Sequence, residues 1–221
     1  MVNKFRDVVK HPGVKEYSSK RGKIGILAVH GGRLDHGTEQ VANYVHAKTP
    51  ASLYVMSSRG GDIGKHRVAS TQIAHTHSKH LNDIISHVNY NISIHGHNKP
   101  GHEKTVYVGG ENAYLRQKVA AKLKQYLPSE YTVEHDVNKM PRNVRGTGRN
   151  VTNRSKEGGV QVELPTELRQ GVGKQYDSPK LAGLTQKVGQ AISEVVNSEF
   201  KAKPDLHYKG KEYKGEYQKA A

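Results

Sequence analysis

Short hydrophobic runs alternate with amphipathic segments along the chain. Apolar runs bounded by Gly, Pro and Asn are typical of strands, and apolar positions three and four residues apart are typical of helices. Because strands and helices alternate, we expect an α/β fold whose mixed, mostly parallel sheet is covered by helices on both faces. The predicted strands are 24–29, 53–57, 66–70, 90–95, 105–108, 131–134 and 160–164. The predicted helices are 37–45, with Thr38 as N-cap, 79–88, 111–127 and 181–200.

Two segments lack this periodicity. Residues 138–159 contain Pro, Gly, Asn and Arg but no apolar run, so we expect a long loop of the functional or disordered kind. The C-terminal tail, 201–221, is charged and is expected to be flexible. Since no repeat or linker divides the rest, we predict a single domain over residues 1–200.

Composition narrows the possible chemistry. The chain of 221 residues contains no cysteine, which excludes disulfides, thiolate catalysis and cysteine-ligated metal. Its formal net charge of +15 favours a polyanionic partner such as nucleic acid, anionic lipid, teichoic acid or polyglutamate. No apolar run reaches the roughly 18 residues of a membrane span, so we expect no membrane partner. The first residues do not resemble a signal peptide, and we expect synthesis in the cytoplasm.

Three predicted strands end in side chains that bind metal or transfer protons. His30 follows the run 24–29, His95 ends the second run, and Glu163 lies in the last strand. Such ends meet at one edge of a parallel sheet, which predicts one cleft. Zinc with nitrogen and oxygen ligands and an open position activates water for hydrolysis, so a metal-dependent hydrolase is favoured over a binding protein.

Ordinary explanations exist for each of these residues. Fourteen histidines make some chance clusters inevitable, and a lone His-Gly-Gly is weak as a motif. Glu163 would also suit the N-terminus of a helix near Thr166, where the helix dipole favours a carboxylate. A carboxylate buried in an apolar strand is costly without a partner, however, and this favours a functional role.

Four motifs occur in order: HGGRLDHGT at 30–38, SIHG at 93–96, NVTNR at 150–154 and GVQVELPTELR at 159–169. Together they resemble the phage-type poly-γ-glutamate hydrolase family, which is related in fold to the zinc carboxypeptidases. The resemblance spans roughly residues 20–200. It implies a zinc cofactor and roles for individual residues: zinc ligands His30, Asp35 and His95, catalytic Glu163, and Asn153 and Arg154 for a substrate carboxylate.

Asp35 departs from the family pattern, which usually has Glu at this position, one methylene longer. Either the backbone approaches the metal more closely, or His36 or Glu39 replaces Asp35 as a ligand. His97 competes with His95 in the same way. We predict Asp35 and His95.

The resemblance implies a zinc-dependent hydrolase that cleaves the γ-glutamyl amide bonds of poly-γ-glutamate, a capsule depolymerase with Glu163 as general base. The tetrahedral oxyanion would be held by zinc and by a guanidinium from Arg142, Arg145 or Arg149. We expect a monomer. As a bacteriophage protein without a signal peptide, it would act outside the cell after host lysis.

Two other functions are weighed against this one. A carboxypeptidase- or aminoacylase-like amidohydrolase would use the same metal site on small substrates. A basic nucleic-acid-binding protein would explain the charge, with incidental histidines. Against that second alternative, the most basic segments, 142–156 and 201–220, are predicted loop and tail, and no recognition motif is present.

Overall fold

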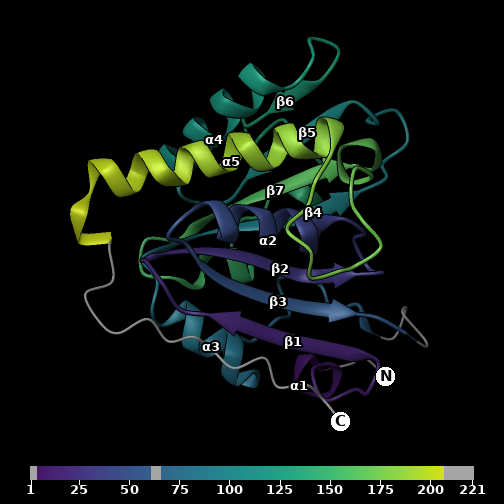
Figure 1. Cartoon of the computed structure of the whole chain (residues 1–221), viewed down its shortest axis with the longest axis vertical. Helices are drawn as coiled ribbons and strands as arrows, with labels where there is room; N and C mark the ends of the chain where they lie inside the picture. The colour runs from purple at the N-terminus through teal and green to yellow at the C-terminus, as the bar shows by residue number, and fades with distance from the viewer. Residues whose placement is uncertain (1–3, 61–65, 207–221) are drawn as a thin grey trace.

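The computed structural model describes residues 4–60 and 66–206 of the chain. Within these residues the centre of the molecule is a seven-stranded mixed sheet, in the order β1-β3-β2-β4-β7-β5-β6 (Figure 1). In that order the strands are β1 (Val14–Ser19), β3 (Ser52–Ser58), β2 (Ile24–Gly32), β4 (Tyr90–His97), β7 (Gly159–Pro165), β5 (Thr105–Gly109) and β6 (Thr132–Glu134).

The central strands β3, β2, β4 and β7 run parallel to one another. β1 pairs antiparallel with β3, β5 pairs antiparallel with β7, and β6 runs parallel to β5. β2, β3 and β7 are buried along their whole length, as expected for strands covered on both faces. The carboxyl ends of β2, β4 and β7 therefore meet at one edge, which is where the predicted strand-end residues lie.

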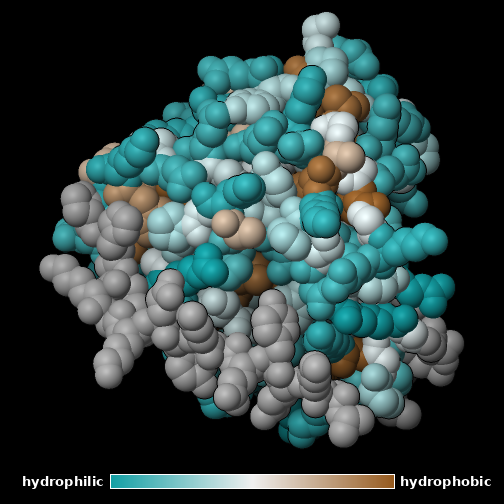
Figure 2. All heavy atoms as spheres, viewed as in Figure 1, coloured by the Kyte–Doolittle hydropathy of each residue, from teal (hydrophilic) through white to brown (hydrophobic). Residues whose placement is uncertain are grey.

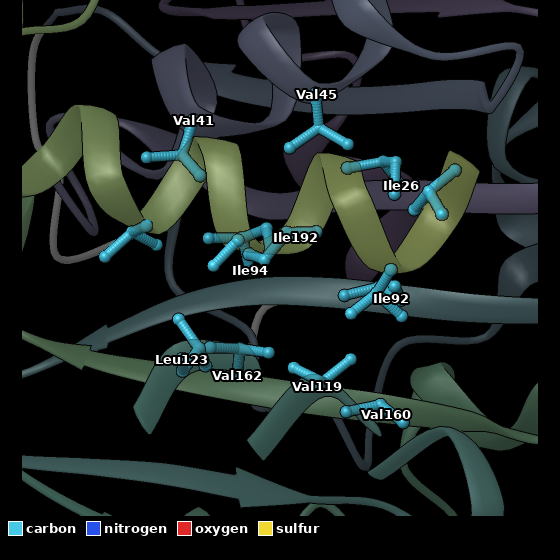
Figure 3. Close-up of a cluster of buried hydrophobic side chains, with 14 of the residues drawn as sticks. Ile26, Val41, Val45, Ile92, Ile94, Val119, Leu123, Val160, Val162 and Ile192 are labelled. Carbon is cyan, nitrogen blue, oxygen red and sulfur yellow. The ribbon is translucent and has the colours of Figure 1, made fainter. Parts of the chain in front are cut away.

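Three helices cover one face of the sheet: α2 (Thr38–Lys48), α4 (Ala113–Tyr126) and α5 (Gly183–Ala202) (Figure 1). Their apolar side chains and those of alternate strand positions form the largest core cluster. Figure 3 shows these side chains facing one another, with Val41, Val45, Val119, Leu123 and Ile192 from the helices and Ile26, Ile92, Ile94, Val160 and Val162 from the strands.

The second face carries α1 (Phe5–Val8) and α3 (Lys79–Ile85), which pack against the other strand positions in a separate core cluster. Leu27 and Tyr54 of the sheet contact this cluster, together with Val151 from the predicted loop. Helices therefore lie on both faces, and the predicted α/β fold with a mostly parallel mixed sheet is confirmed.

The predicted loop 138–159 contains two short 3₁₀ turns, η3 (Arg142–Val144) and η4 (Val151–Arg154). It covers polar side chains on the second face of β4 and β7. Asn150 donates to the side-chain oxygen of Gln161 at 2.7 Å, and Asn91 donates to the carbonyl of Thr152 at 3.4 Å. The loop thus supplies hydrogen-bond partners to buried polar side chains of the sheet.

Some predicted elements differ from the structure. The strand predicted at 66–70 is wrong: these residues form no strand, because they contact side chains and loops rather than a neighbouring strand. Thr38 is the first residue of α2 and not its N-cap, which is Gly37 with φ of 88°. Further short 3₁₀ turns are η2 (His75–His77), η5 (Thr166–Arg169) and η6 (Pro204–Leu206).

The C-terminal tail was predicted to begin at residue 201. α5 continues to Ala202, and Leu206 is buried in the main core, with its carbonyl accepting a hydrogen bond from Lys23 N at 2.7 Å. The rest of that predicted tail lies outside the described residues. No helix in the described ranges combines the length and apolarity of a membrane span.

The face that carries α2, α4 and α5 is mostly hydrophilic, with small separate hydrophobic spots (Figure 2). Among the described residues, the one large hydrophobic side chain that is exposed is Tyr114. Such scattered apolar positions are normal on a water-facing surface.

Candidate metal centre

A β-bulge in β2 determines where His30 points. The register of β2 against β3 shifts between Ala28 and Gly31, so β2 carries one extra residue there. Strict alternation would have put His30 on the face of Ile26 and Ala28, which pack under the helices. A bulge re-aims the side chain that follows it. His30 instead lies beside His95, with ring centroids 5.0 Å apart.

His95 and Glu163 are direct neighbours across β4 and β7. The parallel register pairs them, and it pairs Glu163 with Tyr107 on the other side. Successive strand residues point to opposite faces, and Ile94 and Val162 belong to the core under the helices. His95 and Glu163 therefore share the opposite face at the carboxyl edge of the sheet.

Asp35 reaches the two histidines from the turn between β2 and α2. Its N–H donates to His30 O at 2.8 Å, and Thr38 Oγ1 donates to Asp35 O at 2.7 Å, which fix the turn. Asp35 Oδ2 lies 3.4 Å from His30 Nδ1 and 3.6 Å from His95 Nδ1. Gly96 N also donates to this oxygen, at 3.3 Å. The ligand atoms of the three buried residues lie within 4.8 Å of one another.

The nitrogens of His30 suit a metal ligand. Its Nε2 lies 2.8 Å from Val68 O, and because a carbonyl only accepts, the proton is on Nε2. The lone pair is then on Nδ1, which is buried and makes no hydrogen bond. A buried nitrogen without a partner, facing a second imidazole and a carboxylate, fits a bound cation. Two His and one carboxylate with an open position are a common zinc set.

The pKa shifts of the group agree with this fit. Burial would raise the pKa of Asp35, but the neighbouring rings of His30 and His95 outweigh it and hold that pKa well below its usual value. Burial lowers the pKa of His95, which keeps the ring neutral near neutral pH. An ionised carboxylate and a neutral imidazole are the forms that bind metal.

Two residues that follow the undescribed segment 61–65 orient this group. Arg67 Nη2 lies 2.5 Å from Asp35 Oδ1, the carboxylate oxygen that does not face the histidines. Val68 supplies the carbonyl that fixes the proton on His30. Partners of this kind hold metal ligands in one orientation and strengthen binding. Sequence reasoning missed both residues, because a predicted strand there carried no sign of these distant contacts.

His66 anchors the same segment. Gly13 N donates to His11 Nδ1 at 3.0 Å, so this nitrogen is an acceptor and receives a hydrogen bond from His66 Nε2, also at 3.0 Å. The other ring nitrogen of His66 then accepts from Ser58 Oγ at 2.7 Å. His66 is buried and links both the sheet and the N-terminal segment to the residues that follow it, Arg67 and Val68.

Glu163 is buried next to the group but is not part of it. Its Oε1 accepts a hydrogen bond from Gln161 Nε2 at 2.8 Å. Burial and the negative charge of Asp35 raise the pKa of Glu163 well above its usual value, opposed by Arg67, Arg169 and Lys99. A carboxyl whose proton affinity is raised in this way is suited to accept and return a proton.

The alternative ligands have other surroundings. His36 is exposed, and His97 Nε2 contacts Thr105 O at 2.8 Å. Glu39 is buried and accepts from Tyr17, Ser57 and Arg59. None of the three alternatives joins the group of possible ligands found in the described ranges.

Asn153 and Arg154 lie on η4, among the turns of the loop. The side chain of Asn153 accepts from Glu111 N at 3.2 Å and donates to Gly146 O at 2.8 Å. Arg154 is exposed and donates to Arg149 O at 3.1 Å. The structure shows no contact between this pair and the three possible ligands, so their role stays a prediction.

The loop arginines proposed for the oxyanion differ in exposure. Arg142 and Arg149 are exposed. Arg145 is half-buried, and its Nε donates to Met140 O at 2.9 Å. The positive charges that act on Glu163 come instead from Arg67, Arg169 and Lys99, none of which sequence reasoning assigned to the site.

Comparison with known proteins agrees with this geometry. The model of a family described as poly-gamma-glutamate hydrolase matches residues 5–198. The chain belongs to the poly-γ-glutamate hydrolase family. It is therefore an enzyme, and the family resemblance predicted from its motifs is confirmed. No curated protein sequence gives a significant match.

Solved structures share the fold of this hydrolase. A bacteriophage poly-gamma-glutamate hydrolase has a TM-score of 0.72 and 21% identity, with 86% of this chain and 91% of the other covered. A zinc-free structure named YNDL has a TM-score of 0.70 and 18% identity, with 85% and 91% covered. At these identities the likeness is one of fold.

Proposed function

We propose that the enzyme is a zinc-dependent hydrolase that cleaves the γ-glutamyl amide bonds of poly-γ-glutamate. The observation that carries the proposal is the buried group of His30, Asp35 and His95 beside the buried carboxyl of Glu163. Zinc bound by these three residues supplies Lewis acidity toward a carbonyl oxygen and toward water. Family membership supports the reaction class and the substrate.

Glu163 is the general base in this proposal. It accepts the proton of the attacking water and later returns it to the leaving amide nitrogen. Its raised pKa supports both steps, since a carboxyl with an ordinary pKa would be a weaker base and a poorer proton donor at neutral pH. Gln161 donates to one oxygen of Glu163 and so holds the carboxyl in one orientation.

The charges around the site support an anionic substrate. Each unit of poly-γ-glutamate carries one free carboxylate. Lys99 is half-buried at the end of β4, and Arg67 is 51% exposed, so both have positive charge open to a ligand near Glu163. Guanidinium and ammonium groups bind carboxylates well. We assign Asn153 and Arg154 to a further substrate carboxylate, on the strength of the motif and of the exposed guanidinium.

The setting of the reaction is also part of the proposal. We infer from the resemblance that the polymer is a bacterial capsule, that the enzyme acts as a monomer, and that a bacteriophage releases it by lysis. The bacteriophage hydrolase of similar fold supports this inference.

Metal analysis combined with viscometry tests the function. We expect purified enzyme to contain about one zinc ion per chain. Chelation should stop the fall in viscosity of a poly-γ-glutamate solution, and added zinc should restore it. Cleavage of small acyl-amino acids but not the polymer would favour the amidohydrolase alternative. The proposal would be contradicted if the purified protein contained no metal and bound DNA tightly. It would also be contradicted if the protein contained zinc but had no hydrolytic activity.

A further inference from the structure

Arg169 connects the turn after β2 with the ends of β4 and β7, at the edge of the sheet where the candidate metal ligands lie. It ends η5, a short turn directly after β7, and is 7% exposed. Its Nε donates to Leu164 O at 3.0 Å, its Nη1 to His36 O at 2.6 Å, and its Nη2 to His97 O at 3.3 Å. All three acceptors are backbone carbonyls, so the contacts determine where the backbone lies.

Each carbonyl lies one or two residues from a residue of the site. His36 follows Asp35 directly, His97 lies two residues after His95, and Leu164 follows Glu163. His36 and His97 are 133 and 72 residues from Arg169 in sequence. The ends of β4 and β7 are already paired with each other, and this one rigid group joins both of them to the turn after β2.

Two glycines leave room for Arg169. A Cβ on Gly96 would lie 2.5 Å from Arg169 Cζ, and a Cβ on Gly37 would lie 2.1 Å from Arg169 O. Both distances are far shorter than a van der Waals contact, so a side chain at either position would clash with Arg169. Gly96 therefore accommodates this guanidinium between the two neighbouring histidines, His95 and His97.

We propose that Arg169 is a positioning residue that holds Asp35, His95 and Glu163 in the geometry needed for metal binding and catalysis. The proposal rests on the proposed function. A guanidinium suits this task because its donors point in fixed, coplanar directions, whereas a lysine ammonium is a single point that cannot reach three separate carbonyls in this way. Charge alone is therefore insufficient, and Arg169→Lys should resemble Arg169→Met.

Zinc affinity, measured by competition with a chromophoric chelator, tests this without any substrate. We expect Arg169→Met, Arg169→Lys and Gly96→Ala each to weaken zinc binding by about tenfold to a hundredfold. The absorption bands of bound Co²⁺ should also change in Arg169→Lys, since they report the arrangement of the ligands. Gly96→Ala and Arg169→Lys keep the test decisive if Arg169→Met does not fold.

Arg21→Met is the matched control. Arg21 also donates to two backbone carbonyls, His46 O at 2.8 Å and Thr49 O at 3.4 Å, but it precedes β2, at the opposite edge of the sheet. Its loss should lower the melting temperature and leave zinc affinity unchanged. Equal loss of zinc in Arg21→Met, or wild-type affinity in Arg169→Lys, would overturn the proposal. Wild-type protein that binds zinc without cleaving the polymer would refute only the proposed function.

Discussion

Two carboxyl groups near the carboxyl ends of β2 and β7 have opposite pKa shifts, and this difference fits the roles proposed for them. Asp35 faces two imidazoles that outweigh the effect of burial, so its pKa is held well below its usual value, which favours the ionised form that a metal ligand requires. Glu163 is buried beside that negative charge, so its pKa is raised. Paired acidic groups whose surroundings separate their pKa values are typical of hydrolytic sites.

Glu163→Gln should lower turnover by orders of magnitude and preserve metal binding. An amide has the same shape and can still accept the hydrogen bond from Gln161, but it cannot take a proton. We expect kcat on poly-γ-glutamate to fall by about 10²–10⁴, with zinc content and melting temperature close to wild type. Steady-state kinetics with elemental analysis measure this. Substantial residual activity would assign the base to another residue.

Asp35→Ala should weaken zinc binding more than His36→Ala does. Asp35 is 4% exposed and lies between the two histidines, whereas His36 is exposed and contributes its carbonyl to Arg169. His36→Ala retains that carbonyl and serves as the matched control in the same turn. Zinc titration of the two variants gives the order. The reverse order would move the ligand by one position.

At the scale of elements, α2 contains a histidine whose ionisation opposes folding. His46 Nδ1 contacts Ala51 O at 2.8 Å. Burial, and then the positive charge of Arg21, lower the pKa of His46 to about 4. The unfolded chain takes up the proton near the ordinary value of about 6.5. Stability from neutral His46 is therefore present above that pH and lost as the pH falls toward 4.

We expect this loss to be on the order of 2 kcal/mol for the wild type after allowance for partial exposure. His46→Asn, whose amide nitrogen takes the place of Nδ1, should lose less stability on acidification because it has no such group to protonate. Urea unfolding at neutral pH and near pH 4.5 measures the difference. His36→Asn, at an exposed position, should follow the wild type, and a parallel pH dependence in all three proteins would contradict this account.

Some elements of the structure could be predicted from local sequence, and others could not. Strands β2, β4 and β7 follow from apolar runs, and α4 and α5 follow from helical periodicity, because these signals lie within a few adjacent residues. The bulge that turns His30 toward His95 left no such signal, since it depends on the register of β2 against β3. Residues 66–70 were wrongly predicted to form a strand because the apolar content that suggested it is local. The residues that they contact are distant in sequence and left no local signal.

At the scale of the whole molecule, the sheet brings together segments that are distant in sequence. His30, His95 and Glu163 meet because three parallel strands present their carboxyl ends at one edge. The net charge of +15 gives the protein as a whole a field that attracts polyanions. A field of this sign affects capture of the polymer more than the chemical step.

Salt should therefore raise KM for poly-γ-glutamate and leave kcat nearly unchanged. Raising ionic strength from about 0.02 to about 0.5 M shortens the screening length several-fold and removes long-range attraction. Kinetics on the polymer across this range measure the effect. A substrate whose free carboxylates are methyl-esterified is the control and should show little salt dependence. A KM for the polymer that does not change with salt would contradict a role for the net charge.

By itself, the sequence determined the alternating elements, the polyanionic preference and the placement of His30, His95 and Glu163 at strand ends. Periodicity can be read within a short segment, and net charge is a sum over the whole chain, so neither requires knowledge of the tertiary structure. Only the tertiary structure decided that Asp35, and not His36 or Glu39, stands between the histidines. It also revealed Arg67 and Arg169 beside the site. Their hydrogen bonds join residues that are distant in sequence, and such contacts leave no pattern in the segments that they join.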